Sequence, residues 1–101
     1  GGQKNRVGGP LSLFSFIGAG TTGIIDNSSN SIIGSGDNNR VLDSKGGSIV
    51  GGFAGTISDS PFSFIGTGEF NAAGTSDYGF IGTGRRNAIT ARCMYSSLGR
   101  A

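Results

Sequence analysis

The sequence predicts an all-β protein, a parallel β-solenoid (β-roll or β-helix) of about six rungs of 16 residues. Three observations predict this fold. Glycine supplies 21 of the 101 residues, and each glycine inside a helix costs about 1 kcal/mol relative to alanine, which disfavours a helical domain. A Ser-apolar-apolar-Gly block recurs along the chain. A Gly or Asn residue then recurs at a spacing of 18 and, after that, of 16 residues four times.

The composition excludes several other classes of protein. Collagen needs glycine near one third of the residues at a period of three, with abundant proline, whereas this chain has two prolines. The chain contains 4 Leu, 10 Ile, 3 Val and 7 Phe residues and a net charge of only +2, which is unlike a disordered chain. It has no run of about 20 apolar residues, so we expect no membrane insertion.

Each rung is expected to begin with a short strand marked by the apolar block or a variant of it. The blocks are Ser15–Gly18, Ser31–Gly34, Ser48–Gly51, Ser63–Gly66, Gly79–Gly82 and Ser97–Gly99. Neighbouring residues of a strand point to opposite faces, so the two apolar residues of a block belong to two ladders. The ladders are Phe16, Ile32, Ile49, Phe64 and Phe80, and Ile17, Ile33, Val50, Ile65, Ile81 and Leu98. One ladder should fill the core and the other should face outward and need a cover; the pattern leaves open which is which.

A corner and a second strand are expected to complete each rung. The corner residues are Asn5, Gly23, Asn39, Gly55, Asn71 and Asn87. Gly and Asn adopt positive φ most readily, so their exchange at one position predicts a left-handed backbone there. Two residues past each corner stands a small or branched apolar residue: Val7, Ile25, Val41, Ile57, Ala73 and Ile89. A turn rich in Ser, Asp, Asn and Gly then returns the chain to the next rung.

A partial aromatic ladder precedes the first strand of several rungs. It contains Phe14, Phe62, Tyr78 and Tyr95, with Asn30 and Gly47 at the same position. We interpret it as rings that stack between rungs; the alternative is an exposed stripe that meets a partner or a sugar. Tyr78 and Tyr95, together with Arg85 and Arg86, are the candidates for surface contact. The late arginines could attract a phosphate-bearing surface, but solubilising charge is the simpler interpretation.

The repeat makes residues 1–101 a single repeat domain, which we expect to be a fragment of a longer fibre. The expected rungs are residues 1–14, 15–30, 31–47, 48–62, 63–78 and 79–95, with a further rung starting at 96–101. A chain of this size buries a marginal core alone, so its stability should come from repetition, oligomerisation or both.

No motif predicts catalysis or a cofactor. Residues Gly18–Gly23 match G-x-G-x-x-G, but turn residues follow where a dinucleotide-binding fold needs a helix. The chain has no histidine and a single cysteine, Cys93, which removes a Ser-His-Asp arrangement, a His or Cys metal cluster and an intrachain disulfide. The acidic residues do not follow the spacing of calcium-binding β-rolls. We therefore expect no enzyme, no cofactor and no nucleic-acid partner, with a cation in a corner as a minor alternative.

The repeat resembles the glycine-rich repeats of phage and giant-virus tail-fibre proteins, and also the head repeats of trimeric autotransporter adhesins. The clearest matches are Ser63 to Asn71 and Phe80 to Asn87, and the resemblance covers Gly2 to Ala101. The fibre-type repeat is the closer match, because the adhesin heads use a shorter unit. The resemblance implies a parallel β-roll, assembled as a homotrimer in a threefold bundle, and it implies no catalytic residue.

The function expected from these patterns is structural. The chain would be a stiff, non-enzymatic shaft segment of a viral tail fibre or surface filament, located outside the cell or on the virion surface, that supports attachment to a host. One alternative is an adhesin head that binds a host glycan, matrix or cell-surface receptor through an aromatic and arginine stripe. The other is a self-assembling extracellular filament whose subunits stack end to end.

Overall fold

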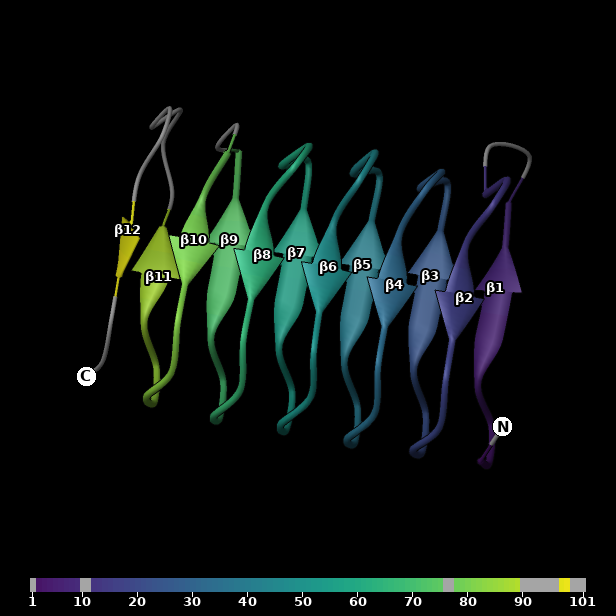
Figure 1. The fold of residues 1–101 in the computed structure, drawn as a ribbon, viewed down its shortest axis with the longest axis horizontal. Helices are drawn as coiled ribbons and strands as arrows, with labels where there is room; N and C mark the ends of the chain where they lie inside the picture. The colour runs from purple at the N-terminus through teal and green to yellow at the C-terminus, as the bar shows by residue number, and fades with distance from the viewer. Residues whose placement is uncertain (1, 10–11, 76–77, 90–96, 99–101) are drawn as a thin grey trace.

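The computed structural model describes residues 2–9, 12–75, 78–89 and 97–98, and these residues contain strands and turns but no helix (Figure 1). The strands alternate between two six-stranded sheets. The odd sheet holds β1 (Arg6–Gly8), β3 (Ile24–Asp26), β5 (Arg40–Leu42), β7 (Thr56–Ser58), β9 (Ala72–Gly74) and β11 (Ala88–Ile89). The even sheet holds β2 (Phe16–Ile17), β4 (Ile32–Ile33), β6 (Ser48–Ile49), β8 (Phe64–Ile65), β10 (Phe80–Ile81) and β12 (Ser97–Leu98).

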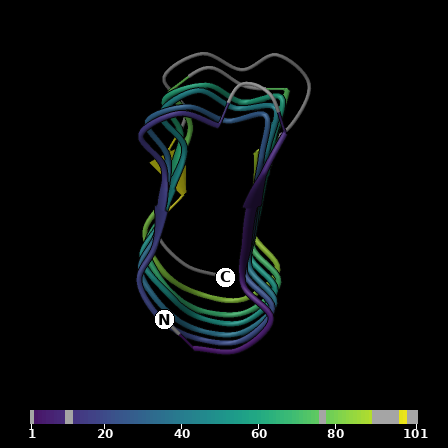
Figure 2. The ribbon, with the colours of Figure 1, turned by 90° about the vertical axis from the view of Figure 1, so that its right-hand side faces the viewer.

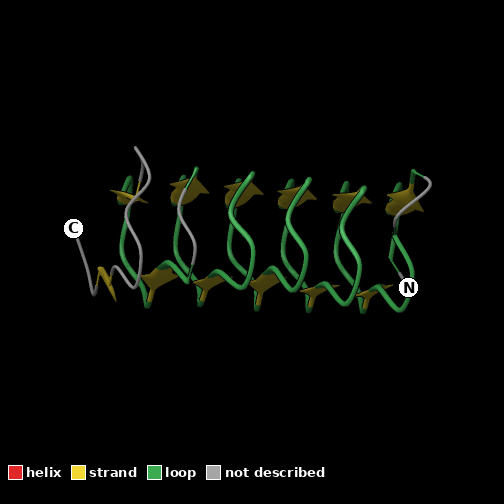
Figure 3. Cartoon of the chain, turned by 90° about the horizontal axis from the view of Figure 1, so that it is seen from above, coloured by secondary structure: helices red, strands yellow, loops and turns green. Residues whose placement is uncertain are grey.

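All pairings are parallel, and each strand pairs with the equivalent strand of the next rung. In the even sheet, Ile17 pairs with Ile33, Ile33 with Ile49, and Ile49 with Ile65. The predicted all-β parallel solenoid is therefore confirmed, with about 5 turns. The two sheets form opposite sides of a narrow loop (Figure 2), and the rungs follow one another along the longest axis (Figure 3). The molecule measures 29 × 24 × 14 Å.

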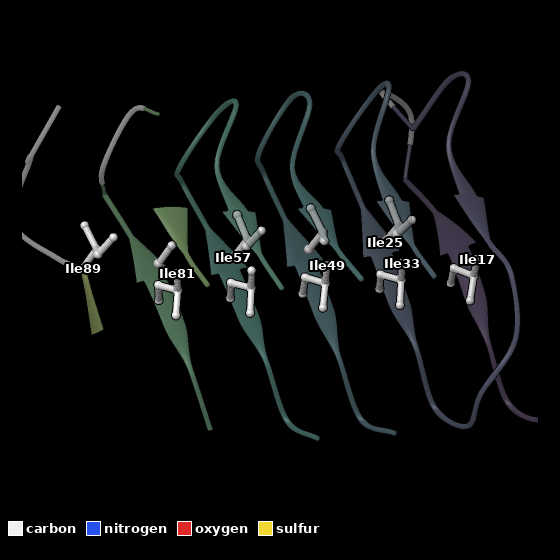
Figure 4. Close-up of a cluster of buried hydrophobic side chains, with 10 residues drawn as sticks. Ile17, Ile25, Ile33, Ile49, Ile57, Ile81 and Ile89 are labelled. Atoms are coloured by element: carbon white, nitrogen blue, oxygen red, sulfur yellow. The ribbon is translucent and has the colours of Figure 1, made fainter. Parts of the chain in front are cut away.

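The hydrophobic core is a double column between the sheets, to which each strand from β2 to β11 contributes one inward side chain (Figure 4). The core residues are Ile17, Ile25, Ile33, Val41, Ile49, Ile57, Ile65, Ala73, Ile81 and Ile89. Full burial of an isoleucine side chain contributes about 1.5–3 kcal/mol. Isoleucine predominates because a β-branched side chain fits a pleated surface on which every rung presents the same position.

The register of the third rung corrects the expected ladders. Ile49, not Val50, is the inward residue: Ile49 is fully buried and pairs with Ile65, whereas Val50 is half exposed. The rung boundary therefore falls between Gly46 and Gly47, and the expected rungs 31–47 and 48–62 were wrong by one residue. A shift of one residue would turn the isoleucine out of the core, and burial decides against it.

The left-handed residues also differ from the expected ones. The expected corner residues lack positive φ; the residues just before them have it instead, with φ between 54° and 62° at Lys4, Thr22, Asn38, Ala54, Phe70 and Arg86. Two residues earlier, every rung has a glycine, at positions 2, 20, 36, 52, 68 and 84 (the glycine column). Within this column Gly36 has a φ of 98°, and a Cβ there would lie 2.2 Å from the carbonyl oxygen of Gly52 in the next rung. Only glycine fits such a close approach between backbones.

Candidate interaction surface

The predicted corner residues form one column in which asparagine and glycine alternate through the first five rungs, and the side chains of Asn5, Asn39 and Asn71 bind the rung that follows. We call these asparagines the asparagine column. Asn39 is buried; its Nδ2 donates to the carbonyl oxygens of Ser35 and Gly52, and its Oδ1 accepts from the N–H of Gly55 at 2.8 Å. Asn5 and Asn71 make the equivalent bonds to the rungs that follow them. Asparagine recurs here because its side chain satisfies turn backbone groups, not because its backbone is left-handed.

Two columns of serines hold the opposite turns together. The first contains Ser12, Ser28, Ser44 and Ser60, and the Oγ of each of the first three accepts a hydrogen bond from the N–H of the next serine at 2.9–3.1 Å. The second begins with Ser15, whose Oγ accepts from Ser31, and Ser31 and Ser63 accept from Gly47 and Gly79 in the same way. Sequence inspection missed these serines as functional groups, although their spacing of 16 residues was visible.

The outward ladder lies on the even sheet. Its residues are Phe16, Ile32, Ser48, Phe64 and Phe80, which we call the ridge. Phe16, Ile32 and Phe80 are 60%, 48% and 45% exposed. Beside the ridge, two residues further along each rung, lie Gly18, Gly34, Val50, Gly66 and Gly82, which we call the trough. The structure thus answers the question left open by the pattern, because the ladder that contains the phenylalanines faces outward.

Several aromatic rings pack against one another between rungs. Phe62 stacks on Tyr78, with ring centroids 5.5 Å apart, and Phe64 stacks on Phe80 at 5.1 Å. The rings are nearly parallel, at 13° and 9°. The interpretation of the partial aromatic ladder as stacking between rungs therefore holds for Phe62 and Tyr78. Rings stacked in this way turn their faces toward each other and not toward a sugar.

The candidate contact residues do not form one stripe. Tyr78 lies in a turn between β9 and β10, at the upper edge of Figure 1, whereas Arg85 and Arg86 lie in the turn between β10 and β11, at the lower edge. Tyr95 lies outside the described residues, as do Cys93, Arg92 and Arg100. Arg85 forms an exposed ion pair with Glu69 at 3.7 Å.

The lower edge instead carries an aromatic and charged cluster that sequence inspection missed. The guanidinium of Arg86 lies 5.9 Å from the ring centroid of Phe70, and Phe53 meets Phe70 edge to face at 5.3 Å. Phe53 and Phe70 are 17 residues apart, so a search at a period of 16 does not align them. The cation and the edge-to-face contact occupy the ring of Phe70.

Charged residues are distributed unevenly over the described surface. The outward positions of the odd sheet include Arg6 and Arg40, and the edges carry carboxylates and cations such as Asp43, Lys45 and Glu69. The ridge and the trough contain no charged residue. A broad apolar face without charge is typical of the centre of a protein interface, so this face is the candidate interaction surface.

Within the described ranges, no group of three or more Cys, Asp or Glu side chains could hold a metal ion. The same residues include no helix that is long and apolar enough to cross a membrane. No protein-family model, curated protein or solved structure matches the chain.

Proposed function

We propose that the chain is a structural, non-enzymatic shaft segment of an extracellular fibre, of the viral tail-fibre or surface-filament type. The observation that carries this proposal is the use made of the buried polar side chains. Ser28, Ser31, Asn39, Ser44, Ser63 and Asn71 are buried, and the side chain of each forms a hydrogen bond with an adjacent rung. An active site needs polar groups that can contact a substrate, whereas these groups hold the rungs together.

The same contacts support a mechanical role. Neighbouring rungs share two parallel strand pairings and stacked core side chains. Serine hydrogen bonds join their turns, and the asparagine side chains join every second pair of rungs. In such a solenoid the stability is approximately a sum over rungs and their interfaces, so a long shaft is made by repetition. Ladders that run along the axis resist bending, because bending opens one edge of every rung interface.

The alternative of a glycan-binding adhesin can be separated from the spacer function by a binding experiment. The intact chain should be tested against host cells and a glycan array, together with the variants Tyr78→Ala and Arg85→Ala, whose positions lie on opposite edges. A spacer shows no binding. Binding that Tyr78→Ala or Arg85→Ala abolishes, with the fold intact by circular dichroism, would refute the spacer function in favour of an adhesin.

Sedimentation of the same samples tests the second alternative. A shaft segment should form assemblies of fixed mass. A polymer that lengthens with protein concentration would instead identify a self-assembling filament built from subunits stacked end to end.

A further inference from the structure

We infer that the outer face of the even sheet binds a second copy of this chain, with the two solenoids parallel and related by a twofold axis along their length. This inference deepens the proposed function, on which it rests, because it states what covers the apolar face of the shaft segment. It also names two copies, where the resemblance in sequence implied three.

Large and small residues are paired in every rung of this face. In four rungs the ridge residue is large and the trough residue is glycine, as in Phe64 and Gly66. In the central rung the order is reversed, with Ser48 on the ridge and Val50, which is 49% exposed, in the trough. Each rung therefore carries one large outward side chain and one small position. At Gly18, Gly34 and Gly66 the backbone of the next rung lies so close that a Cβ would meet its carbonyl oxygen, so these positions present bare backbone.

A parallel twofold pair fits this pattern. A twofold axis that runs along the solenoid between ridge and trough places each ridge residue opposite the trough residue of the partner at the same level. Every rung then pairs a large residue with a small one: phenylalanine or isoleucine faces glycine in four rungs, and Ser48 faces valine in the central rung. An antiparallel pair would set ridge against ridge, with Ile32 opposite Phe64 and the troughs left empty. Close packing favours the parallel arrangement.

The spacing along the axis matches as well. Phe64 and Phe80 stack with their centroids 5.1 Å apart, so the projections follow the separation of neighbouring strands. A second copy repeats its small residues at the same separation, so large and small residues can face each other at all five levels. A partner with another repeat would lose this match after a few rungs.

The size of the broad face sets the upper limit of the contact area. The broad face measures 29 by 24 Å, which limits flat contact to roughly 700 Å² per copy, or about 1,400 Å² in total, within the usual range of specific interfaces. A twofold interface uses the same patch on both copies, whereas a ring of three needs two different patches on each copy.

The test uses the whole chain and a matched pair of variants. Ile32→Lys introduces a charge on the ridge, and Ala72→Lys introduces the same charge on the outward side of the odd sheet, where the paired residues Thr56 and Ala88 are uncharged. Sedimentation equilibrium should give twice the 10.1 kDa mass of the chain. Ile32→Lys should raise the dissociation constant at least about a hundredfold, because each dimer would bury two unpaired lysines. Ala72→Lys should leave the constant unchanged, and both variants should keep the β circular dichroism spectrum.

Charge exchange tests the orientation. In the parallel pair the two residues at position 32 lie at the same level, so mixing Ile32→Lys with Ile32→Glu should restore a dimer. In an antiparallel pair the double variant Ile32→Lys/Phe64→Glu would restore it instead, which would overturn the parallel arrangement.

A monomer at every concentration, or a trimer, would overturn the twofold pair. A monomer without affinity for host surfaces would do so while leaving the spacer function in place, so the two proposals fail separately.

Discussion

Replacing Asn39 by alanine should destabilise the fold strongly, because this side chain joins three backbone groups in two rungs. Asn39 is 1% exposed. The substitution leaves the buried N–H of Gly55 without its acceptor and removes the donor to the carbonyls of Ser35 and Gly52. Gly23 and Gly55 occupy the same position in other rungs, so a chain without this amide should still fold.

The magnitude follows from the three bonds. An unsatisfied buried N–H, here that of Gly55, costs about 1–3 kcal/mol. The carbonyls of Ser35 and Gly52 can keep other partners or reach water, so the loss of each of these two bonds costs less. Together they should lower the free energy of unfolding by about 3 kcal/mol, which for a domain of roughly 100 residues lowers Tm by roughly 10–25 °C.

The assay is thermal and urea unfolding followed by circular dichroism, and Asn87→Ala serves as the matched control. Asn87 is only half-buried, and its Nδ2 donates to the carbonyl of Thr83 in a solvent-exposed bond, so its loss should cost less than about 1 kcal/mol. Equal losses of stability for Asn39→Ala and Asn87→Ala would show that the asparagine column does not hold the rungs together.

Three further predictions concern other columns. Gly36→Ala should prevent folding, because the Cβ would lie 2.2 Å from a backbone oxygen, whereas Gly8→Ala, with its nearest neighbour at 3.8 Å, should change stability by less than about 1 kcal/mol; soluble yield and Tm measure both. Ile49→Ala should cost about 2–5 kcal/mol in urea unfolding of the monomer and Val50→Ala less than about 1, and the reverse order would contradict the register. Ser44→Ala should cost about 1–3 kcal/mol, because the next rung loses the acceptor of a buried N–H; an unchanged urea midpoint would argue against the serine columns.

The inward and outward roles could be predicted only in part from the sequence. Two adjacent apolar residues such as Phe64 and Ile65 require opposite faces, since the side-chain period of a strand is two. Both residues are apolar, so the pattern contains no polar residue to mark the solvent side. In the third rung the apolar block aligns Val50 with the inward isoleucines, whereas the structure aligns Ile49 with them. Both residues are apolar, so hydrophobicity alone does not distinguish the two registers.

The asparagines show a second limit of sequence reasoning. Their exchange with glycine suggested a left-handed backbone, but Asn39 stabilises the fold through the hydrogen bonds of its buried side chain. Two of these bonds are made with a carbonyl and an N–H group of another rung, 13 and 16 residues away in the sequence. Such partners become visible only when the rungs are stacked. Likewise, Tyr78 and Arg85 are seven residues apart, yet the strand β10 between them carries them to opposite edges.

By itself the sequence determined the fold class and the rung length. Glycine disfavours a helix wherever it occurs, and the 16-residue repeat can be read directly from the order of the residues. The tertiary structure decided which ladder is buried, which residue of each corner is left-handed and where the apolar face lies. These features depend on contacts between rungs, where backbone groups approach within hydrogen-bond distance and every polar group that is buried must find a partner.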